Sequence, residues 1–461
     1  MEPKHKLKRA HIIAIGGAVM HNLAIILKSK GYIVSGSDDE IFEPSRSKLF
    51  KYGLLPDQAG WRPDLITSEI DFIILGMHAR KDNPELVKAL KLGIQIYSYP
   101  EYIYEMTKSK KRIVISGSHG KTTITAMIMH TLKYNNYEFD YLLGAKIEGL
   151  DGMVGLSDNS SLAVIEGDEY FSSPLDPTPK FHHYKPHIAL ISGIAWDHIN
   201  VYPQYETYIE QFNKLIQKIE DKGLLIYYEN DDQLRNIAED FKNDIKSISY
   251  SAHPYKNENG ITSLLYRDKK IPLKIFGEHN MQNLNGARLV CNQLGIKDPR
   301  FYEAIRTFQG ASKRLQLIES NDYTSIYIDF AHSPSKLEAT VKAVKSQFPG
   351  RELVACMELH TFSSLNKQFL LNYKGTMDLA DIAIVYYNPE TLIHKRLDMI
   401  SEKEVTDAFG LKRLKVFTDP GRLTKELTSI DWKNKNLLLM SSGDFSGIDI
   451  NNLAKKFVNY Q

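Results

Sequence analysis

Short apolar runs alternate with stretches of helical periodicity along the whole chain. In the first quarter, the runs at 11–15, 32–35 and 71–75 have the length of strands, and glycines follow the first two. Between those two runs, one face of a predicted helix is apolar, through Met20, Leu23, Ala24 and Leu27. Strands separated by helices are typical of a parallel, doubly wound sheet. We therefore expect the chain to begin with an α/β domain.

The same pattern restarts twice further along the chain. A second set of strand-like runs lies at 112–115, 162–165, 187–192 and 224–228. A third set follows residues 308–310, at 325–329, 352–357, 382–386 and 437–441. The predicted fold class is α/β with three domains: a Rossmann-like domain at 1–109, a central domain with a mainly parallel sheet at 110–311, and a second Rossmann-like domain at 312–461.

Length and composition agree with several compact domains. The chain has 461 residues, 43% of them hydrophobic, and a formal net charge of +2. Because the charge is nearly balanced and the basic clusters are short, we expect no nucleic-acid partner. The polar N-terminus precedes no long apolar run, so neither a secretion signal nor a membrane span is expected. The two cysteines, Cys291 and Cys356, are interpreted as buried thiols in a reducing cytoplasm.

A glycine-containing loop carries the strongest chemical signal. The segment Gly117-Ser118-His119-Gly120-Lys121-Thr122-Thr123 joins the run at 112–115 to a predicted helix. Such a turn is typical of phosphate binding, because its backbone amides and the helix dipole face the oxygens. Lys121 would pair with the β- and γ-phosphates, and the Thr122 hydroxyl would reach Mg²⁺. Because Ile115 stands where the longer common pattern has its first glycine, a chance match on a tight turn is the alternative.

Polar residues also follow two further strand-like runs of the central domain. Glu166-Gly167-Asp168-Glu169 comes directly after 162–165, and Trp196-Asp197-His198 comes after 187–192. Acidic groups at such strand ends hold Mg²⁺ directly or through water, and His198 is a candidate ligand. Taken alone, an exposed acidic turn and a structural histidine explain them as well. The ends of successive parallel strands meet in one crevice, so we expect both segments near the loop.

Four segments in this order resemble the Mur ligases, the ATP-dependent enzymes that build the peptide stem of peptidoglycan. The loop 117–123 resembles the family's phosphate loop, and 277–283 (Gly-Glu-His-Asn-Met-Gln-Asn) resembles its Gly-x-His-Asn-x-x-Asn segment. Lys313-Arg314 resembles the basic pair that opens the last domain, and 329–334 (Asp-Phe-Ala-His-Ser-Pro) resembles the Asp-Tyr-Ala-His-x-Pro signature. The resemblance covers essentially the whole chain.

The resemblance implies an acyl-phosphate ligase that uses ATP and Mg²⁺. Its substrates would be UDP-N-acetylmuramate and an amino acid or tripeptide. The implied catalytic residues are Lys121, Glu166 and His198, with Thr122, Glu166 and His198 at the metal. ATP would contact Gly117, His119, Gly120, Lys121, Thr122, Thr123, Asn283 (adenine), Arg314 (phosphate) and Asp329 (ribose). The UDP-sugar would contact Gly16, Gly17, Ala18, Met20, Ser37 and Asp38 in the first domain. Residues 78–84 are a further candidate for the nucleotide sugar.

Two branches of the family act on the bare UDP-N-acetylmuramate, adding either L-alanine or a recycled tripeptide. Tyr170 and the segments 180–186 and 441–448 resemble the tripeptide-adding branch, the murein peptide ligases. The L-alanine-adding branch is the alternative.

Five positions can be compared with the family pattern, and two of them bear on the choice of branch. Four depart from the family pattern: Ala14 and Gly167 replace a glycine and an alanine, and Ser333 and Thr361 replace a histidine and an arginine. The last two put the identity of the amine in question. Phe212 lies near the carbamylated lysine of other Mur enzymes, an absence that both branches share.

Three other classes of protein remain as rivals. A folate-glutamate ligase of the same fold would lack the first domain. An NAD-dependent oxidoreductase would leave Lys121 without a role, and Gly16-Gly17-Ala18 does not complete the dinucleotide fingerprint. A non-catalytic nucleotide sensor would have a degenerate site, whereas Lys121, Glu166 and His198 are all present.

Overall fold

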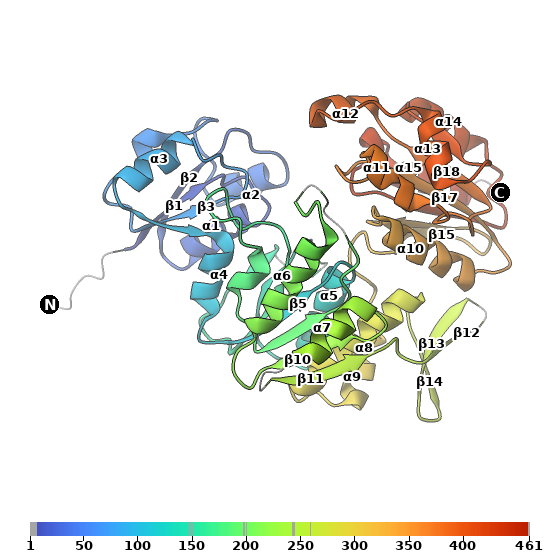
Figure 1. The fold of residues 1–461 in the computed structure, drawn as a ribbon, viewed down its shortest axis with the longest axis horizontal. Coiled ribbons are helices and arrows are strands. Elements are labelled where there is room, and N and C mark those ends of the chain that lie inside the picture. The colour runs from blue at the N-terminus through green and yellow to red at the C-terminus, as the bar shows by residue number, and fades with distance from the viewer. Residues whose placement is uncertain are drawn as a thin grey trace.

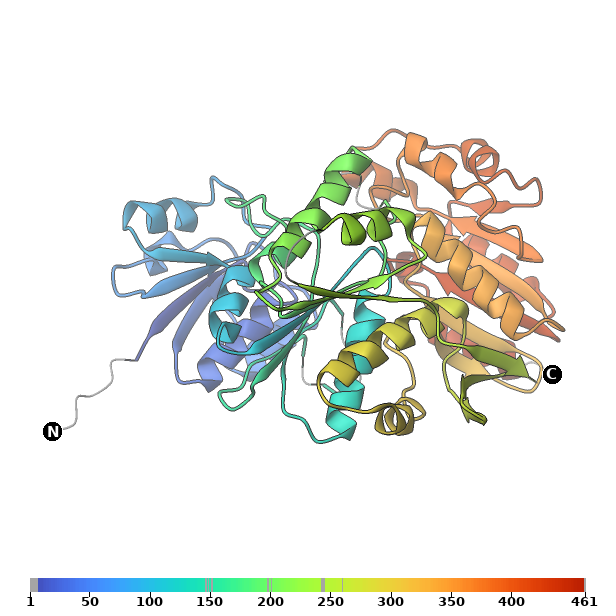
Figure 2. The same ribbon diagram turned by 60° about the horizontal axis from the view of Figure 1, so that its bottom comes forward.

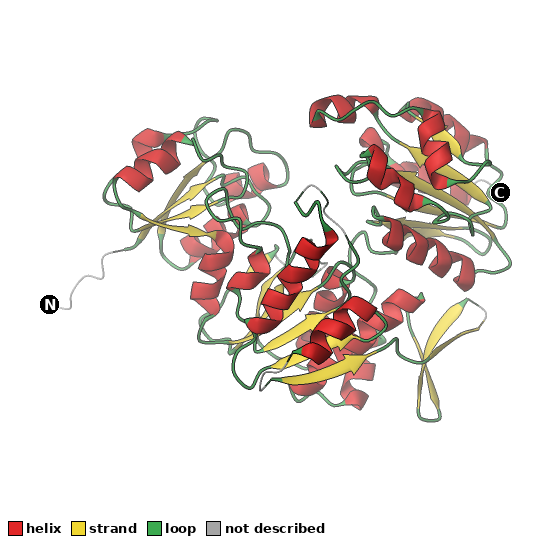
Figure 3. Cartoon of the chain, in the orientation of Figure 1, coloured by secondary structure: helices red, strands yellow, loops and turns green. Residues whose placement is uncertain are grey.

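The protein consists of three α/β units that follow one another along the chain (Figure 1). This computed structural model describes residues 7–145, 147, 149–150, 152–196, 199, 201–241, 245–258 and 260–459. Helices lie on both faces of the main sheet of each unit, as Figure 3 shows by colour. The predicted α/β class with mainly parallel sheets is confirmed.

The first unit is built on a parallel four-stranded sheet in the order β2-β1-β3-β4. The predicted strand at 11–15 is shifted by two residues, because Ala14 takes a left-handed conformation with φ of 65° that ends the strand. The elements are β1 (Arg9–Ile13), α1 (Met20–Ser29), β2 (Ile33–Ser37), α2 (Ser45–Lys51), β3 (Phe72–Leu75), α3 (Pro84–Lys91), β4 (Gln95–Ser98) and α4 (Tyr99–Thr107).

The central unit has a seven-stranded sheet in the order β11-β10-β9-β5-β8-β6-β7, parallel except for the pair β6–β7. Its strands are β5 (Lys111–Ser116), β6 (Asp140–Leu142), β7 (Val154–Gly155), β8 (Leu162–Glu166), β9 (Ile188–Ile191), β10 (Leu224–Tyr228) and β11 (Lys246–Tyr250). Its helices are α5 (Lys121–Tyr134), the 3-10 turn η2 (Lys180–His183), α6 (Tyr205–Gln217), α7 (Asp232–Asp240), α8 (Glu278–Gln293) and α9 (Asp298–Ile305).

A small antiparallel sheet projects from the central unit toward α10 of the third (Figures 1 and 2). It consists of β12 (Tyr255–Glu258), β13 (Ile261–Tyr266) and β14 (Lys269–Pro272). The Thr262 hydroxyl donates to Gln347 Oε1 at 2.9 Å, and Gln347 Nε2 donates to the Gly260 carbonyl at 2.6 Å. These bonds connect the small sheet to the end of α10.

The third unit has a six-stranded sheet in the order β15-β16-β20-β17-β18-β19, parallel except for β15. Its strands are β15 (Gln316–Ser320), β16 (Ser325–Asp329), β17 (Glu352–Glu358), β18 (Ile382–Tyr386), β19 (Lys415–Phe417) and β20 (Lys435–Met440). Its helices are α10 (Pro334–Gln347), α11 (Lys367–Leu370), α12 (Pro389–Lys395), α13 (Glu402–Phe409), α14 (Pro420–Ser429) and α15 (Ile450–Asn459).

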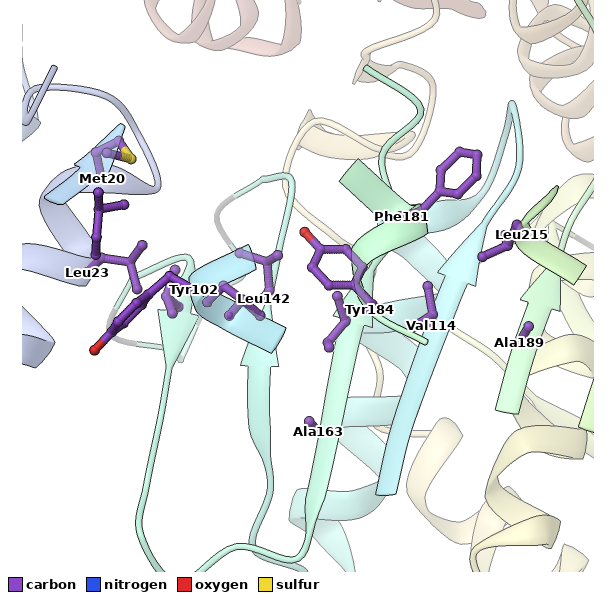
Figure 4. Close-up of a cluster of buried hydrophobic side chains, with 14 of the residues drawn as sticks. Met20, Leu23, Tyr102, Val114, Leu142, Ala163, Phe181, Tyr184, Ala189 and Leu215 are labelled. Carbon is purple, nitrogen blue, oxygen red and sulfur yellow. The ribbon is translucent and has the colours of Figure 1, made fainter. Parts of the chain in front are cut away.

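One hydrophobic core runs without a break from the first unit into the central one. Leu23 of α1 and Tyr102 of α4 belong to the same buried cluster as Leu142 of β6, as Figure 4 shows. In contrast, the third unit has two clusters of its own, and of the central unit's buried hydrophobic residues only Phe276 joins them among the described residues. The first two units therefore form one packed body.

Candidate active site

A cavity of about 670 Å³ lies where the three units meet, at the carboxyl ends of the central strands. The first unit contributes Gly17 to Met20, and the third contributes Arg314 and Asp329. The central unit contributes the loop 118–123 together with Glu166. The cavity thus brings together most of the residues that the sequence singles out, from segments far apart in the chain.

Two glycines shape the phosphate loop. Gly117 and Gly120 have φ of 124° and 75°, in the region that L side chains rarely adopt. A Cβ at Gly120 would lie 2.1 Å from Asn283 Oδ1, and one at Gly117 would lie 2.5 Å from Ser192 Oγ. The loop is therefore packed closely against α8 and the end of β9, and residues 118–123 line the cavity.

Lys121, the first residue of α5, is held by an acidic partner. Its Nζ donates to the Gly117 carbonyl at 2.6 Å and to Glu169 Oε2 at 2.8 Å. Burial lowers the pKa of Lys121, but the Glu169 and Asp168 carboxylates outweigh this and raise it above its usual value. Lys121 is therefore charged. We did not expect Glu169 as its partner, although it lies only three residues beyond Glu166.

Thr122 and Glu166 form the pair expected for Mg²⁺. The Thr122 hydroxyl donates to Glu166 Oε1 at 2.8 Å, and the Gly144 amide donates to Oε2 at 2.9 Å. Hydroxyl and carboxylate oxygens are the ligands that Mg²⁺ prefers, so the donors present fit this ion. The third expected ligand, His198, lies outside the described residues.

The third unit reaches this pair through Arg314. Its Nη2 lies 3.4 Å from the Thr122 hydroxyl, and its guanidinium lies over the Phe330 ring at 4.6 Å. The flanking Lys313 and Leu315 both have positive φ, 54° and 47°, so Arg314 sits in a strained turn beside the cavity.

Asp329, expected at the ribose, follows Arg314 in the cavity wall. Its carboxylate accepts the Leu315 amide at 2.5 Å. Burial raises the pKa of Asp329 to about 6, although Arg314 opposes the shift.

Two further contacts surround the loop. His119 Nε2 lies 2.9 Å from the Ser335 hydroxyl of α10, which joins the loop to the third unit. Asn283, expected at adenine, packs against Gly120 and lines the cavity.

His279 also lines the cavity, and burial lowers its pKa to about 4, so the imidazole is neutral. His279 belongs to the family segment 277–283, yet it was missed as a site residue.

The structure divides the residues expected at the UDP-sugar into two groups. Gly17, Ala18 and Met20 line the cavity, as does His78. Gly16, Ser37 and Asp38 are not part of the cavity wall among the described residues. The Ser37 hydroxyl is buried and donates to Glu85 at 2.6 Å, and the Asp38 carboxylate accepts the Gly16 amide at 2.8 Å. The Asp38 carboxylate therefore holds the glycine turn, whereas the Ser37 hydroxyl is bound to α3 within the first unit.

Two departures from the family pattern have opposite steric consequences. Ala14 stands where glycine is common, and its φ of 65° is the conformation that favours glycine. A Cβ at Gly167 would lie 2.2 Å from the Ser116 hydroxyl and 2.8 Å from Val114 Cγ1. An alanine at this position would therefore have to displace the Ser116 hydroxyl and press on Val114, so glycine suits the position.

The remaining departures lie away from the cavity wall. Ser333 is buried at the start of α10. The Thr361 hydroxyl is 2.9 Å from the Ser364 hydroxyl and closes a local turn. Phe212 is a core residue that packs on Phe181 at 5.5 Å.

The fold and the site together define a protein of three α/β units with a glycine loop of the phosphate-binding type in the cavity where the units meet. Residues 9–111 match the model described as "Mur ligase family, catalytic domain", and residues 115–291 match the Mur ligase middle domain. The chain belongs to the Mur ligase family, whose members are ATP-dependent amide ligases.

Curated relatives come from both branches that act on UDP-N-acetylmuramate. The UDP-N-acetylmuramate–L-alanine ligase of Caldicellulosiruptor saccharolyticus is 31% identical over 82% of this chain and 83% of its own. The UDP-N-acetylmuramate–L-alanyl-γ-D-glutamyl-meso-2,6-diaminoheptandioate ligase of Haemophilus influenzae is 25% identical over 96% of this chain and 98% of its own. The crystal structure of the UDP-N-acetylmuramate–alanine ligase of Thermotoga maritima covers 98% of each chain with a TM-score of 0.71 and 21% identity.

Other surface and core features agree with this picture. In the described part of the chain, no helix combines the length and the apolar character needed to cross a membrane. Both cysteines are buried thiols, as expected, and burial raises the pKa of Cys291 to about 12.

Proposed function

We propose that the chain joins UDP-N-acetylmuramate to L-alanyl-γ-D-glutamyl-meso-diaminopimelate, with ATP as the energy source. The observation that carries this proposal is the single cavity whose walls hold the first unit's glycine turn, the phosphate loop and Arg314. The first unit would bind the UDP-sugar, the central unit ATP, and the third unit the amine. Both nucleotides belong to the cytoplasm, where we place the reaction.

The chemistry follows from charge. A carboxylate is a poor acylating agent, because its leaving group would be oxide. In the proposed first step, a carboxylate oxygen attacks the γ-phosphorus of ATP and the bond to the β,γ-bridging oxygen breaks, which gives an acyl phosphate and ADP. The amine then attacks the carbonyl carbon, loses a proton and expels phosphate.

The described residues neutralise the charge of the two anions that must meet. Lys121 and the start of α5 face the phosphates, and Arg314 adds a second cation. Mg²⁺, held by Thr122 and Glu166, would supply further positive charge at the phosphate oxygens. Closure of the third unit over the cavity would exclude the water that hydrolyses acyl phosphates.

One line of support favours the tripeptide as the amine substrate. The segment 441–448, which resembles the tripeptide-adding branch, borders the third sheet, where Ser441 Oγ and the Phe445 amide both donate to buried Glu358. L-Alanine is the second candidate, because the C. saccharolyticus relative has the higher identity.

Phosphate release tests the proposal directly. Purified protein with ATP, Mg²⁺ and UDP-N-acetylmuramate should release phosphate only after an amine is added, and the tripeptide and L-alanine are supplied in separate reactions. Release with L-alanine alone would assign the other branch. Nucleotide binding without release under any condition would favour a non-catalytic sensor.

A variant tests the phosphate loop. Lys121→Ala should lower phosphate release by about 10³-fold or more, because no other side chain on α5 replaces its charge at the phosphates. Lys133→Ala, on the exposed end of the same helix, is the matched control and should leave release unchanged.

A further inference from the structure

One cation in the cavity is unrelated to the phosphate loop. Lys180, the first residue of η2, lines the cavity, and its side chain is only 8% exposed. Its Nζ donates to Asp168 Oδ2 at 2.6 Å. It also lies over two aromatic rings, 5.5 Å from the centre of Tyr99 and 5.8 Å from that of Tyr170.

We propose that Lys180, held between Tyr99 and Tyr170, is the subsite that binds the reacting carboxylate of the sugar nucleotide. This proposal rests on the proposed function, because it names the part of the acceptor that the cavity recognises. The ligand class is a carboxylate attached to a UDP-sugar.

The location of Lys180 suits this role. Tyr99 begins α4, the helix that joins the first unit to the central one, and the wall of the same cavity also contains Met77 and His78 of the first unit. Lys180 therefore lies on the acceptor side of the cavity, whereas Lys121 lies on the ATP side. The Asp168 carboxylate acts on both sides: it binds Lys180 and also contributes to the raised pKa of Lys121.

The ion pair can be exchanged for a ligand. The Asp168 side chain is 37% exposed, so it can turn to solvent when another carboxylate takes its place on Lys180. An ammonium group has three N–H donors, and the two ring faces stabilise its charge without using those donors. An incoming carboxylate would thus meet a cation that is already desolvated and charged.

The backbone around Lys180 is fixed in advance. The Lys180 amide donates to the Tyr170 carbonyl at 2.9 Å, and His182 Nε2 is 2.8 Å from the Gln211 carbonyl of α6. His183 Nε2 lies 3.0 Å from Asp176 Oδ2, which holds the end of η2 to the preceding loop. Positions fixed in this way lose little entropy on binding, so they favour precise alignment of the bound group.

The placement gives each reacting anion its own cation. The triphosphate would lie on Lys121 and Arg314, and the carboxylate on Lys180, in one cavity of about 670 Å³. Repulsion between the two anions would then be offset before the phosphoryl group moves.

Calorimetric binding without ATP isolates this subsite. The two ligands are UDP-N-acetylmuramate and UDP-N-acetylglucosamine, which differ only in the lactyl group that carries the carboxylate. Lys180→Met should lower the affinity for UDP-N-acetylmuramate by about 10- to 100-fold, because its carboxylate loses a charged hydrogen bond. The affinity for UDP-N-acetylglucosamine, which has no carboxylate, should fall by less than about 2-fold. Lys180→Arg should keep part of the preference.

Two further variants test the direction of the change in affinity and provide a control. Asp168→Asn removes the competing carboxylate, so UDP-N-acetylmuramate should bind as well as to the unmodified chain or more tightly. Lys185→Met alters an exposed lysine of the same segment, outside the cavity, and should change neither affinity. Circular dichroism melting curves establish that each variant is folded.

If Lys180→Met lowered the affinity for both ligands equally, the proposal would be overturned. Lys180 would then bind the diphosphate or support the fold. Weakening of UDP-N-acetylmuramate by Asp168→Asn, to the extent seen for Lys180→Met, would overturn it too, since the ion pair would then be structural. If the unmodified protein binds neither ligand, the proposed function itself fails, and the subsite with it.

Discussion

The two junctions of the central unit differ in their chemistry. At the junction with the first unit, Leu23 and Leu142 are buried in one continuous apolar core. At the junction with the third unit, the contacts around the cavity are polar: Arg314 faces the Thr122 hydroxyl, and Ser335 faces His119. The first junction excludes water and has one well-packed arrangement, whereas the second makes bonds that water or a ligand can replace.

The difference assigns separate tasks to the two junctions. The apolar junction holds the acceptor side of the cavity in a fixed place relative to the phosphate loop. The polar junction also includes an aromatic contact, where Phe276 packs on Tyr327 at 5.4 Å and on Phe348 at 6.0 Å. We expect the third unit to pivot there while the start of α10 and Arg314 approach the nucleotide.

The largest effect is expected at the polar junction, from Arg314→Ala. Phosphate release should fall by about 10³-fold, the scale of removing a cation that stabilises a transferring phosphoryl group. The unfolding free energy should hardly change, because this junction contributes little to packing. Arg306→Ala, at an exposed position shortly before Arg314 in the chain, is the control for phosphate release and for unfolding free energy. Full activity in Arg314→Ala would mean that the third unit does not close on the phosphates.

The apolar junction should show the opposite response. Leu23→Ala removes a fully buried side chain from the shared core, so urea denaturation should show a loss of about 2 to 5 kcal/mol in unfolding free energy. Leu90→Ala, at a leucine that is 54% exposed, should change it by less than about 0.5 kcal/mol. If Leu23→Ala lowered the unfolding free energy as little as Leu90→Ala, the shared core would not stabilise the junction, and the two units would be independently stable.

The sequence predicts the buried strands of the sheets better than the short or half-exposed strands. Every predicted strand is present, because interior parallel strands are uninterrupted apolar runs such as Ile73–Leu75 and Ile113–Ile115. The strands that were missed are short or half-exposed: β4 has the sequence Gln-Ile-Tyr-Ser, and β12 and β14 carry exposed charged residues. Such strands form through tertiary pairing, which no local pattern records.

The same limit applies to the site. The loop 117–123 and Glu166 could be predicted, because each follows a strong strand signal at a known spacing. Lys180 could not be placed in the cavity, because its partners Tyr99 and Asp168 come from segments 81 and 12 residues earlier, brought together only by the fold. The pairing of Gly167 with Ser116 is hidden for the same reason, since it depends on the spacing of two adjacent strands.

Unfolding free energy measured over a range of pH would separate the effect of Asp329 on stability from its expected role at the nucleotide. The pKa of Asp329 is raised to about 6 in the folded chain from a usual 3.8, so protonation favours the folded state. Its contribution to stability is therefore full in acid and is lost as the pH rises from about 4 to about 6. Asp329→Asn should be more stable than the unmodified chain at pH 7, on the order of 2 kcal/mol, and show no advantage at pH 4. An advantage independent of pH would contradict this.

The smallest effect is expected from Ser335→Ala, which removes the hydroxyl that faces His119 across the polar junction. A single neutral hydrogen bond contributes about 0.5 to 1.5 kcal/mol, so the KM for ATP should rise about 2- to 10-fold with stability unchanged. Ser346→Ala lies on an exposed face of the same helix and is the matched control. A fall in stability instead of affinity would show that this bond belongs to a fixed interface, and the two junctions would then differ less than their chemistry implies.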